Sequence, residues 1–222
     1  REEFCAHIGA DPARPLICYS GGDAGTCPED PEHVRALMEL VRDGRIEGRP
    51  QVIVRPVPVD DGRRYQAVCH DFPELIFRKP EWIREPGDWT RVIPTPADVE
   101  FLANLTAHCD LNINLGSTMT LDFGLHDRPV VNIAFDIADP PVFGQPVWDY
   151  YYRFEHYRPV IELGAARFAR SREELAEHVN AYLRDPSLDR EGRCRLAELQ
   201  VGAPLGQSCA RIIAALREIA GA

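Results

Sequence analysis

The chain has 222 residues, and its 35 acidic and 25 basic side chains give a formal net charge of −10 at pH 7. Non-specific nucleic-acid binding needs a basic surface, so this charge disfavours a nucleic-acid partner. The apolar content is an ordinary 45%, and no apolar run approaches the roughly 20 residues that span a bilayer, so we expect no transmembrane segment. The scattered cysteines fit reduced thiols and predict a cytoplasmic protein, associated at most peripherally with the inner face of a membrane.

The chain begins Arg1-Glu-Glu-Phe-Cys5, without an initiator methionine or a secretory signal pattern. This start indicates a fragment of a longer protein from which a whole domain is absent. The seven cysteines are scattered, with no C-x-x-C pair, so we expect neither structural zinc nor a disulfide framework. The histidines lack metal-site or triad-like neighbours, and we expect no metal site.

Apolar runs alternate with helical patterns along the first half of the chain. The glycines and proline at 21–28 predict a loop after the first strand. The expected elements, in order, are a helix over 1–9, a strand over 16–20, a helix from Pro31 to Gly44, a strand over 52–54, a short helix within 60–70, strands at 75–77 and 92–93, and a helix from Pro96 to about 106.

The second half continues this alternation. It predicts a strand over 111–115, a helix over 117–126, a strand over 130–135, an aromatic loop over 136–158, a small strand at 160–161, a helix over 172–184 and two helices at about 188–199 and 207–219. Ser171 and Glu174 are spaced as a capping box. Strands that alternate with helices predict a doubly wound, mostly parallel α/β sheet in one domain. We expect residues 1–12 to be a linker helix from the absent domain and 186–222 a helical tail.

The segment Gly116-Ser117-Thr118 follows a predicted strand and begins a predicted helix. Open α/β sheets bind phosphates at such turns, because the glycine admits the ligand and the hydroxyls and first-turn N–H groups donate to it. The alternative is an ordinary helix N-cap. Asp122 lies one helical turn further, on a helix that we expect to be mostly buried, so its carboxylate needs donors. The helix dipole or Arg128 would serve without any ligand.

Other residues follow predicted strands and are candidates for the same cleft. Gly21 and Gly22 follow the first strand, but they form no nucleotide-binding glycine fingerprint. Arg55 follows the second strand, where it would bind a phosphate or pair with Asp60 or Asp61. Thr95 ends a predicted strand and is a candidate donor contact through its backbone. Asp136 ends the strand after the helix, where it would meet the donor or cap the following loop.

The order Ser117-Thr-x-x-x-Asp122-Phe, Arg128-Pro-Val-Val and Asp136 resembles the pattern of CDP-glycerol glycerophosphotransferases. Related patterns occur in the nucleotide-binding half of GT-B glycosyltransferases of surface polysaccharide synthesis. The segments Val52–Pro58 and Gly206–Ile212 are similar to further motifs of that group. The chain departs from the group's pattern at Val57, which replaces a common histidine, at Asn114-Leu-Gly before the turn, and at Asp122, where many members have glutamate.

The resemblance implies the donor-nucleotide-binding half of a two-domain transferase, metal-independent and without a cofactor. A nucleotide-sugar or CDP-alditol donor would bind with its leaving phosphate on Ser117, Thr118 and Arg55, and its ribose on Asp122. The acceptor would be a glycan hydroxyl, and the base that deprotonates it would come from the absent N-terminal domain, leaving this fragment inactive alone. Two alternatives stay open: a nucleotide-sugar 2-epimerase-like isomerase, and a non-catalytic module that docks a partner through residues 148–157.

Overall fold

Six parallel strands form the centre of the molecule. The computed structural model describes residues 1–84, 92–202 and 206–221. The sheet order is β3-β2-β1-β6-β7-β8, and every neighbouring pair is parallel. The strands are β1 (Leu16–Ser20), β2 (Gln51–Arg55), β3 (Ile76–Phe77), β6 (Leu111–Asn114), β7 (Val130–Ile133) and β8 (Arg167–Ala169). The predicted doubly wound parallel fold is therefore confirmed.

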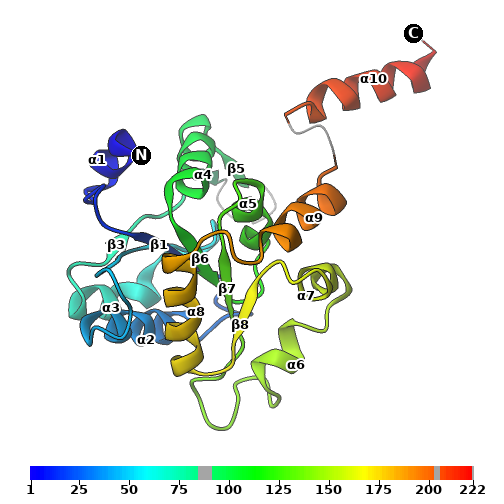
Figure 1. Ribbon diagram of the computed structural model, residues 1–222. Helices are drawn as coiled ribbons and strands as arrows, with labels where there is room; N and C mark the ends of the chain where they lie inside the picture. The colour runs from blue at the N-terminus through cyan, green and yellow to red at the C-terminus, as the bar shows by residue number, and fades with distance from the viewer. Residues whose placement is uncertain (85–91, 203–205, 222) are drawn as a thin grey trace.

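Helices cover both faces of the sheet (Figure 1). One face carries α2 (Asp30–Arg42), α3 (Gln66–Asp71) and α8 (Arg172–Arg184); the other carries α1 (Glu2–Ile8), α4 (Pro96–His108), α5 (Met119–Leu125) and α9 (Arg190–Gln200). Because both faces are covered, all residues of β1, β6 and β7 are buried. This double burial explains why these strands have apolar runs rather than alternating patterns.

The helix ends follow from local chemistry that the sequence contains. Gly9 ends α1 in the left-handed conformation. Ser171 caps α8 by accepting the Glu174 N–H at 3.2 Å. The Glu174 carboxylate accepts the N–H of Arg170 at 2.8 Å, one residue before the cap, so the predicted capping box is formed only on the serine side.

The expected elements differ from the structure in four places. No strand was predicted at β8 (Arg167–Ala169), which forms one edge of the main sheet. Val160–Ile161 lies in a helix, α7 (Arg158–Glu162), because Pro159 fits a first helical turn and favours that state over a strand. The segment 136–158 is not one loop, since it contains α6 (Val147–Tyr151) and a 3-10 helix, Glu155–Tyr157. Finally, β5 (Val92–Pro94) does not join the main sheet but pairs with β4 (Trp82–Arg84) in a separate antiparallel hairpin. Trp89, in the polar segment between the strands predicted at 75–77 and 92–93, lies outside the described residues.

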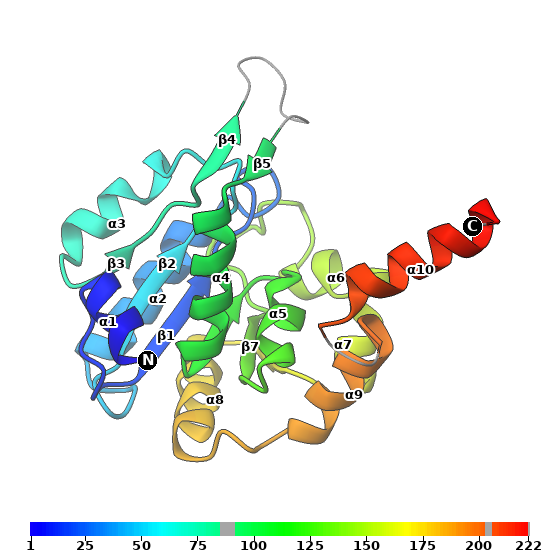
Figure 2. The ribbon, with the colours of Figure 1, turned by 90° about the horizontal axis from the view of Figure 1, so that it is seen from above.

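The last helix, α10 (Ser208–Ala220), extends away from the rest of the domain in both views (Figures 1 and 2). All of its residues are exposed. They include an apolar stripe formed by Ile212, Ile213, Leu216 and Ile219. In the parts of the chain that the structure describes, no helix is long and apolar enough to cross a membrane.

A buried ion pair joins the end of β2 to the start of α4. Arg55 donates to Asp98 at 2.8 Å, and both side chains are less than 10% exposed. The Asp98 carboxylate also accepts the Glu81 N–H at 2.9 Å and the Trp82 indole N–H at 2.7 Å. Burial alone raises the pKa of Asp98, but these donors outweigh it, and the pKa lies below the usual aspartate value. The pair therefore anchors α4 and the β4–β5 hairpin to the sheet.

We predict that Asp98→Ala lowers the free energy of unfolding by about 3–5 kcal/mol, because it leaves the Arg55 charge buried and unpaired. The lowered pKa means that Asp98 stabilises the fold fully above the unfolded aspartate pKa of about 3.9 and loses this contribution as the pH falls through its lower folded pKa. The difference between variant and wild type should therefore shrink below about pH 4 in urea titrations. The control is Glu74→Ala, which removes the exposed Arg42–Glu74 pair and should cost less than about 1 kcal/mol.

Candidate functional site

The strand order reverses direction between the two central strands. After β1 the chain moves outward to β2 and β3, and then returns to the other side of β1 as β6. In doubly wound sheets, ligands bind at the carboxyl ends of the strands at such a reversal. The last residues of the two strands, Ser20 and Asn114, are partners in the register. The predicted turns at Gly21-Gly22 and at Gly116–Thr118 therefore begin side by side.

The second turn keeps unused donors. Gly116 has a φ of +60°, and a Cβ there would lie 3.4 Å from the Tyr151 side chain. The Ser117 N–H donates to Asn114 Oδ1 at 2.9 Å, and Ser117 Oγ accepts the Met119 N–H at 3.2 Å, so this hydroxyl makes a local cap-like bond. Thr118 is exposed, and its N–H and hydroxyl have no partner within the described part of the chain.

Asp122 lies on α5, one turn after Thr118, and is partly buried. No hydrogen bond or ion pair to its carboxylate is found among the residues that the structure describes. The alternative partner Arg128 donates instead to the Ala107 carbonyl at 2.6 Å. Burial raises the pKa of Asp122, and His126 opposes this rise. The carboxylate that sequence reasoning singled out is thus half-buried and lacks a donor, which leaves its ribose role a prediction.

The first turn is already closed by the protein itself. The Gly21 N–H donates to the Arg55 carbonyl at 3.0 Å, and the Gly22 N–H donates to Asp30 at 2.6 Å. Side chains also fill the space: a Cβ at Gly21 would lie 2.3 Å from the Tyr65 hydroxyl, and one at Gly22 would lie 2.4 Å from the Cys27 sulfur. These glycines therefore serve packing, and their N–H groups are occupied.

Three other predicted site residues also have partners inside the protein. Arg55 pairs with an aspartate, as one alternative predicted, but that aspartate is Asp98 and not Asp60 or Asp61. Thr95 caps α4, since its hydroxyl accepts the Asp98 N–H at 3.1 Å. Asp136 accepts the Val147 N–H with both carboxylate oxygens at 3.2 Å, so its capping alternative is confirmed.

The sequence analysis missed the group that holds the first turn. Arg64 donates to Asp60 at 2.6 Å and also to the carbonyls of Gly22 and Cys27. Asp30, fully buried at the start of α2, accepts from Tyr19 at 2.6 Å, from the Gly22 N–H and from Arg64. Burial raises the pKa of Asp30 despite these donors. No short motif indicates this group, because its members are far apart in the chain.

A row of buried polar side chains under α5 was also missed. Its members are Ser20, Asn112, Asn114, Thr120, Asn132 and Tyr157. The available signal was the asparagine at 112, 114 and 132, in strands whose other residues are all apolar. The aromatic segment packs on the sheet here, with Tyr152 donating to the Ile133 carbonyl and Tyr157 to Asn132.

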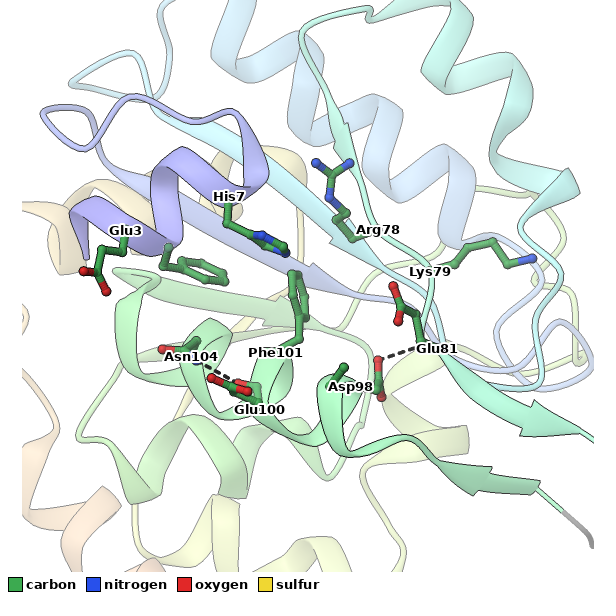
Figure 3. A pocket seen from close by; sticks show the side chains of 11 residues that line it. Glu3, His7, Arg78, Lys79, Glu81, Asp98, Glu100, Phe101 and Asn104 are labelled. Carbon is green, nitrogen blue, oxygen red and sulfur yellow. Dashed lines mark hydrogen bonds between the residues drawn. The ribbon is translucent and has the colours of Figure 1, made fainter.

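A cavity of about 520 Å³ lies elsewhere, between α1, α4 and residues 78–81 (Figure 3). Phe4 and Phe101 form part of its wall, with ring centroids 5.6 Å apart. Arg78 and Glu81 line it from the segment that follows β3. The cavity contains none of the predicted site residues. Among the described residues, no group of three or more histidine, cysteine, aspartate or glutamate side chains is arranged to hold a metal ion.

No protein-family model matches the chain, and no curated protein matches it either. Solved structures do. The wall teichoic acid polymerase TagF matches over 95% of this chain and 44% of its own, with a TM-score of 0.57 and 15% identity. UDP-GlcNAc 2-epimerase from Neisseria meningitidis, bound to UDP-GlcNAc, matches over 98% of this chain and 48% of its own, with a TM-score of 0.58 and 9% identity.

These identities are low enough that the likeness shows the fold alone. The chain has the α/β fold of one half of a GT-B protein, and the predicted resemblance is confirmed at that level. It spans less than half the length of both matched chains.

We predict that Asp122→Asn raises the melting temperature of the free protein by about 1–2 °C at pH 7. The raised pKa of Asp122 means that the fold disfavours its charged form. As the pH rises and Asp122 ionises, the free energy of unfolding therefore falls, and a neutral amide avoids this loss. The gain should vanish at acidic pH, where wild-type Asp122 is protonated.

Asp127→Asn is the matched control for this measurement. Asp127 accepts from the buried Arg193 at 2.9 Å and has a φ of +54°, a conformation that asparagine tolerates. This variant should lower the melting temperature, because it weakens an ion pair without straining the backbone. If Asp122→Asn lowers the melting temperature, as Asp127→Asn is expected to do, the assignment of Asp122 as an unpaired carboxylate is contradicted.

Proposed function

We propose that this chain is the donor-nucleotide-binding half of a transferase that moves a group from a nucleotide-activated donor to an acceptor hydroxyl. The observation that carries the proposal is the pair of turns at the strand reversal. Side chains from other elements close the first turn, and the second has donors without partners among the described residues. The diphosphate of the donor binds at Gly116, Ser117 and Thr118, and Asp122 accepts hydrogen bonds from the ribose.

The chemistry is displacement of the nucleotide by the acceptor oxygen. Negative charge develops on the leaving diphosphate, and donors aimed at that charge lower the barrier. The Thr118 N–H and hydroxyl and the Ser117 hydroxyl are the donors of this half. Arg55 has one buried guanidinium nitrogen without a partner among the described residues, and another that is paired with Asp98. The acceptor and its base belong to the other half of a GT-B protein.

A second candidate is a nucleotide-sugar 2-epimerase-like isomerase. Its support is the likeness to UDP-GlcNAc 2-epimerase, with the same TM-score range as the polymerase. Both candidates place a nucleotide diphosphate at the same turn. Product analysis with UDP-N-acetylglucosamine in the absence of an acceptor, on a chain that contains both halves, separates them, because only the isomerase gives a new sugar without an acceptor.

We predict that the chain is stabilised by a nucleotide diphosphate ester in a thermal-shift screen of UDP-, CDP-, GDP- and ADP-linked donors. A ligand present at about 100 times its Kd adds roughly 2.7 kcal/mol of stability. Thr118→Ala and Asp122→Ala should each reduce the shift, because they remove a donor to the diphosphate and an acceptor for the ribose. Transferase turnover by the chain alone is expected to be absent.

Ser171→Ala is the control for this screen. Ser171 caps α8, so the variant should lose about 1 kcal/mol of unfolding free energy and melt at a lower temperature. The shift that the ligand induces should stay unchanged. If no nucleotide shifts the wild-type chain and the two variants behave like wild type, the non-catalytic docking module becomes the better reading. Robust transferase activity from residues 1–222 alone would refute the division of labour between the two halves.

A further inference from the structure

One chain of buried hydrogen bonds joins the ends of β1, β6 and β7 beneath α5. Asn112 Nδ2 donates to Ser20 Oγ at 2.8 Å and to the Cys18 carbonyl at 3.0 Å. Asn114 Nδ2 donates to Asn112 Oδ1 at 2.7 Å and to Thr120 Oγ1 at 3.0 Å. The participating side chains are nearly fully buried, so they have no water to replace a lost partner.

The shortest contacts favour one arrangement of the remaining protons, although Thr120 Oγ1 also lies 3.4 Å from Asn132 Oδ1. Thr120 Oγ1 accepts from Asn114, so its own hydrogen points to the Tyr157 hydroxyl, 2.8 Å away. The Tyr157 hydroxyl then donates to Asn132 Oδ1 at 2.7 Å. Both hydrogens of the Asn114 amide are therefore engaged, and a flipped amide would place its oxygen against Asn112 Oδ1. The network fixes which atom of Asn114 faces the turn.

The atom that faces the turn is Asn114 Oδ1, and it accepts the Ser117 N–H at 2.9 Å. This bond spans Leu115 and Gly116, the residue with the positive φ. It draws the Ser117 N–H inward, while Thr118 keeps its N–H and hydroxyl without partners in the described part of the chain. Asn114 thus sets which groups of the turn are available to a ligand.

We propose that Asn114 is the positioning residue of the donor site, and that Asn112 and Thr120 act through it by fixing its amide. The inference rests on the proposed nucleotide-binding function. It adds that the turn is shaped from inside the sheet: the buried amide presents the Thr118 donors to the diphosphate and contacts no ligand itself. The aromatic segment, through Tyr157, is coupled to the same turn.

Isothermal titration with UDP-N-acetylglucosamine and with CDP-glycerol compares wild type with Thr120→Val. Valine keeps the shape of threonine but cannot accept from Asn114 or donate to Tyr157. The Kd should rise about tenfold. The control is Thr106→Val, since Thr106 is equally buried and, among the described residues, its hydroxyl bonds only the Leu102 and Ala103 carbonyls within α4. Thr106→Val should leave Kd unchanged, whatever it does to the melting temperature.

Asn114→Asp gives a readout that a merely structural role would not move. At neutral pH its carboxylate cannot donate to Thr120 and repels the diphosphate, so affinity should fall by roughly a hundredfold. When the pH is lowered, the protonated acid can donate its one proton to Thr120 or to Asn112 Oδ1 and accept from Ser117, so affinity should recover in part. The diphosphate diester lacks the second ionisation of a monoester, but protonation of Asp122, whose pKa is raised by burial, should weaken wild-type binding as the pH falls. Recovery of Asn114→Asp is therefore read as a fall in the ratio of its Kd to the wild-type Kd at the same pH.

The outcomes separate this inference from the function on which it rests. Two results overturn the positioning role and leave the proposed function standing, provided that the wild type binds. One is an unchanged Kd for Thr120→Val, and the other is that the affinity of Asn114→Asp does not recover relative to the wild type at low pH. Absence of binding by the wild type to either probe overturns both. If Asn114→Asp does not fold, Thr120→Val against Thr106→Val decides the matter alone.

Discussion

The parallel pairing of β1 with β6 is the constraint on which the rest of the structure depends. Parallel strands place all their carboxyl ends at one edge, and burial on both faces makes the register costly to shift. Ser20 is therefore held against Asn114, and the two glycine turns leave the sheet at neighbouring points. The helices α2 and α5 begin beyond these turns. Neither turn carries a motif that is specific by itself, and their adjacency is a property of the sheet.

The two turns differ because one of them contains a buried carboxylate. Asp30 is fully buried, and a carboxylate in that position requires donors. It obtains them from Tyr19, from the Gly22 N–H and from Arg64, which also binds the turn's carbonyls. The first turn is consequently saturated and rigid. The second turn is supported by neutral amides and hydroxyls, which fix its shape and leave the donors of Thr118 unused.

The fold was largely predictable because its signals are local. Runs of buried apolar residues marked the strands, and Ser171, Gly9 and Pro96 marked helix ends. The strand predicted at Val160–Ile161 was wrong because two apolar residues fit a strand or a helix equally well. Pro159, which fits the first turn of a helix, decides for the helix. Partners were the hardest to predict: Arg55 pairs with Asp98, which lies 43 residues away and is brought near only by the chain's return through β4 and β5.

The candidate site was predictable only where the side chains stay close in sequence. Thr118 and Asp122 share one helix, so their spacing placed them together. The asparagines that shape the turn lie in strands where polar residues look like exceptions to a buried pattern. Such exceptions are informative, because most buried amides find hydrogen-bond partners, as Asn112 and Asn114 do with both their oxygen and their nitrogen, and those bonds then fix the backbone around them.

The charge balance constrains what this half can do with a diphosphate. The net charge is −10, so any attraction must be local. The arginines nearest the reversal are already engaged: Arg55 neutralises Asp98, and Arg64 lies between Asp60 and Asp30. What remains at the turn is hydroxyl and N–H donors, which recognise the shape of a phosphate group but compensate little of its charge. The proposed donor would therefore need further cationic groups from beyond the turn, as in a site shared between the two halves of a GT-B protein.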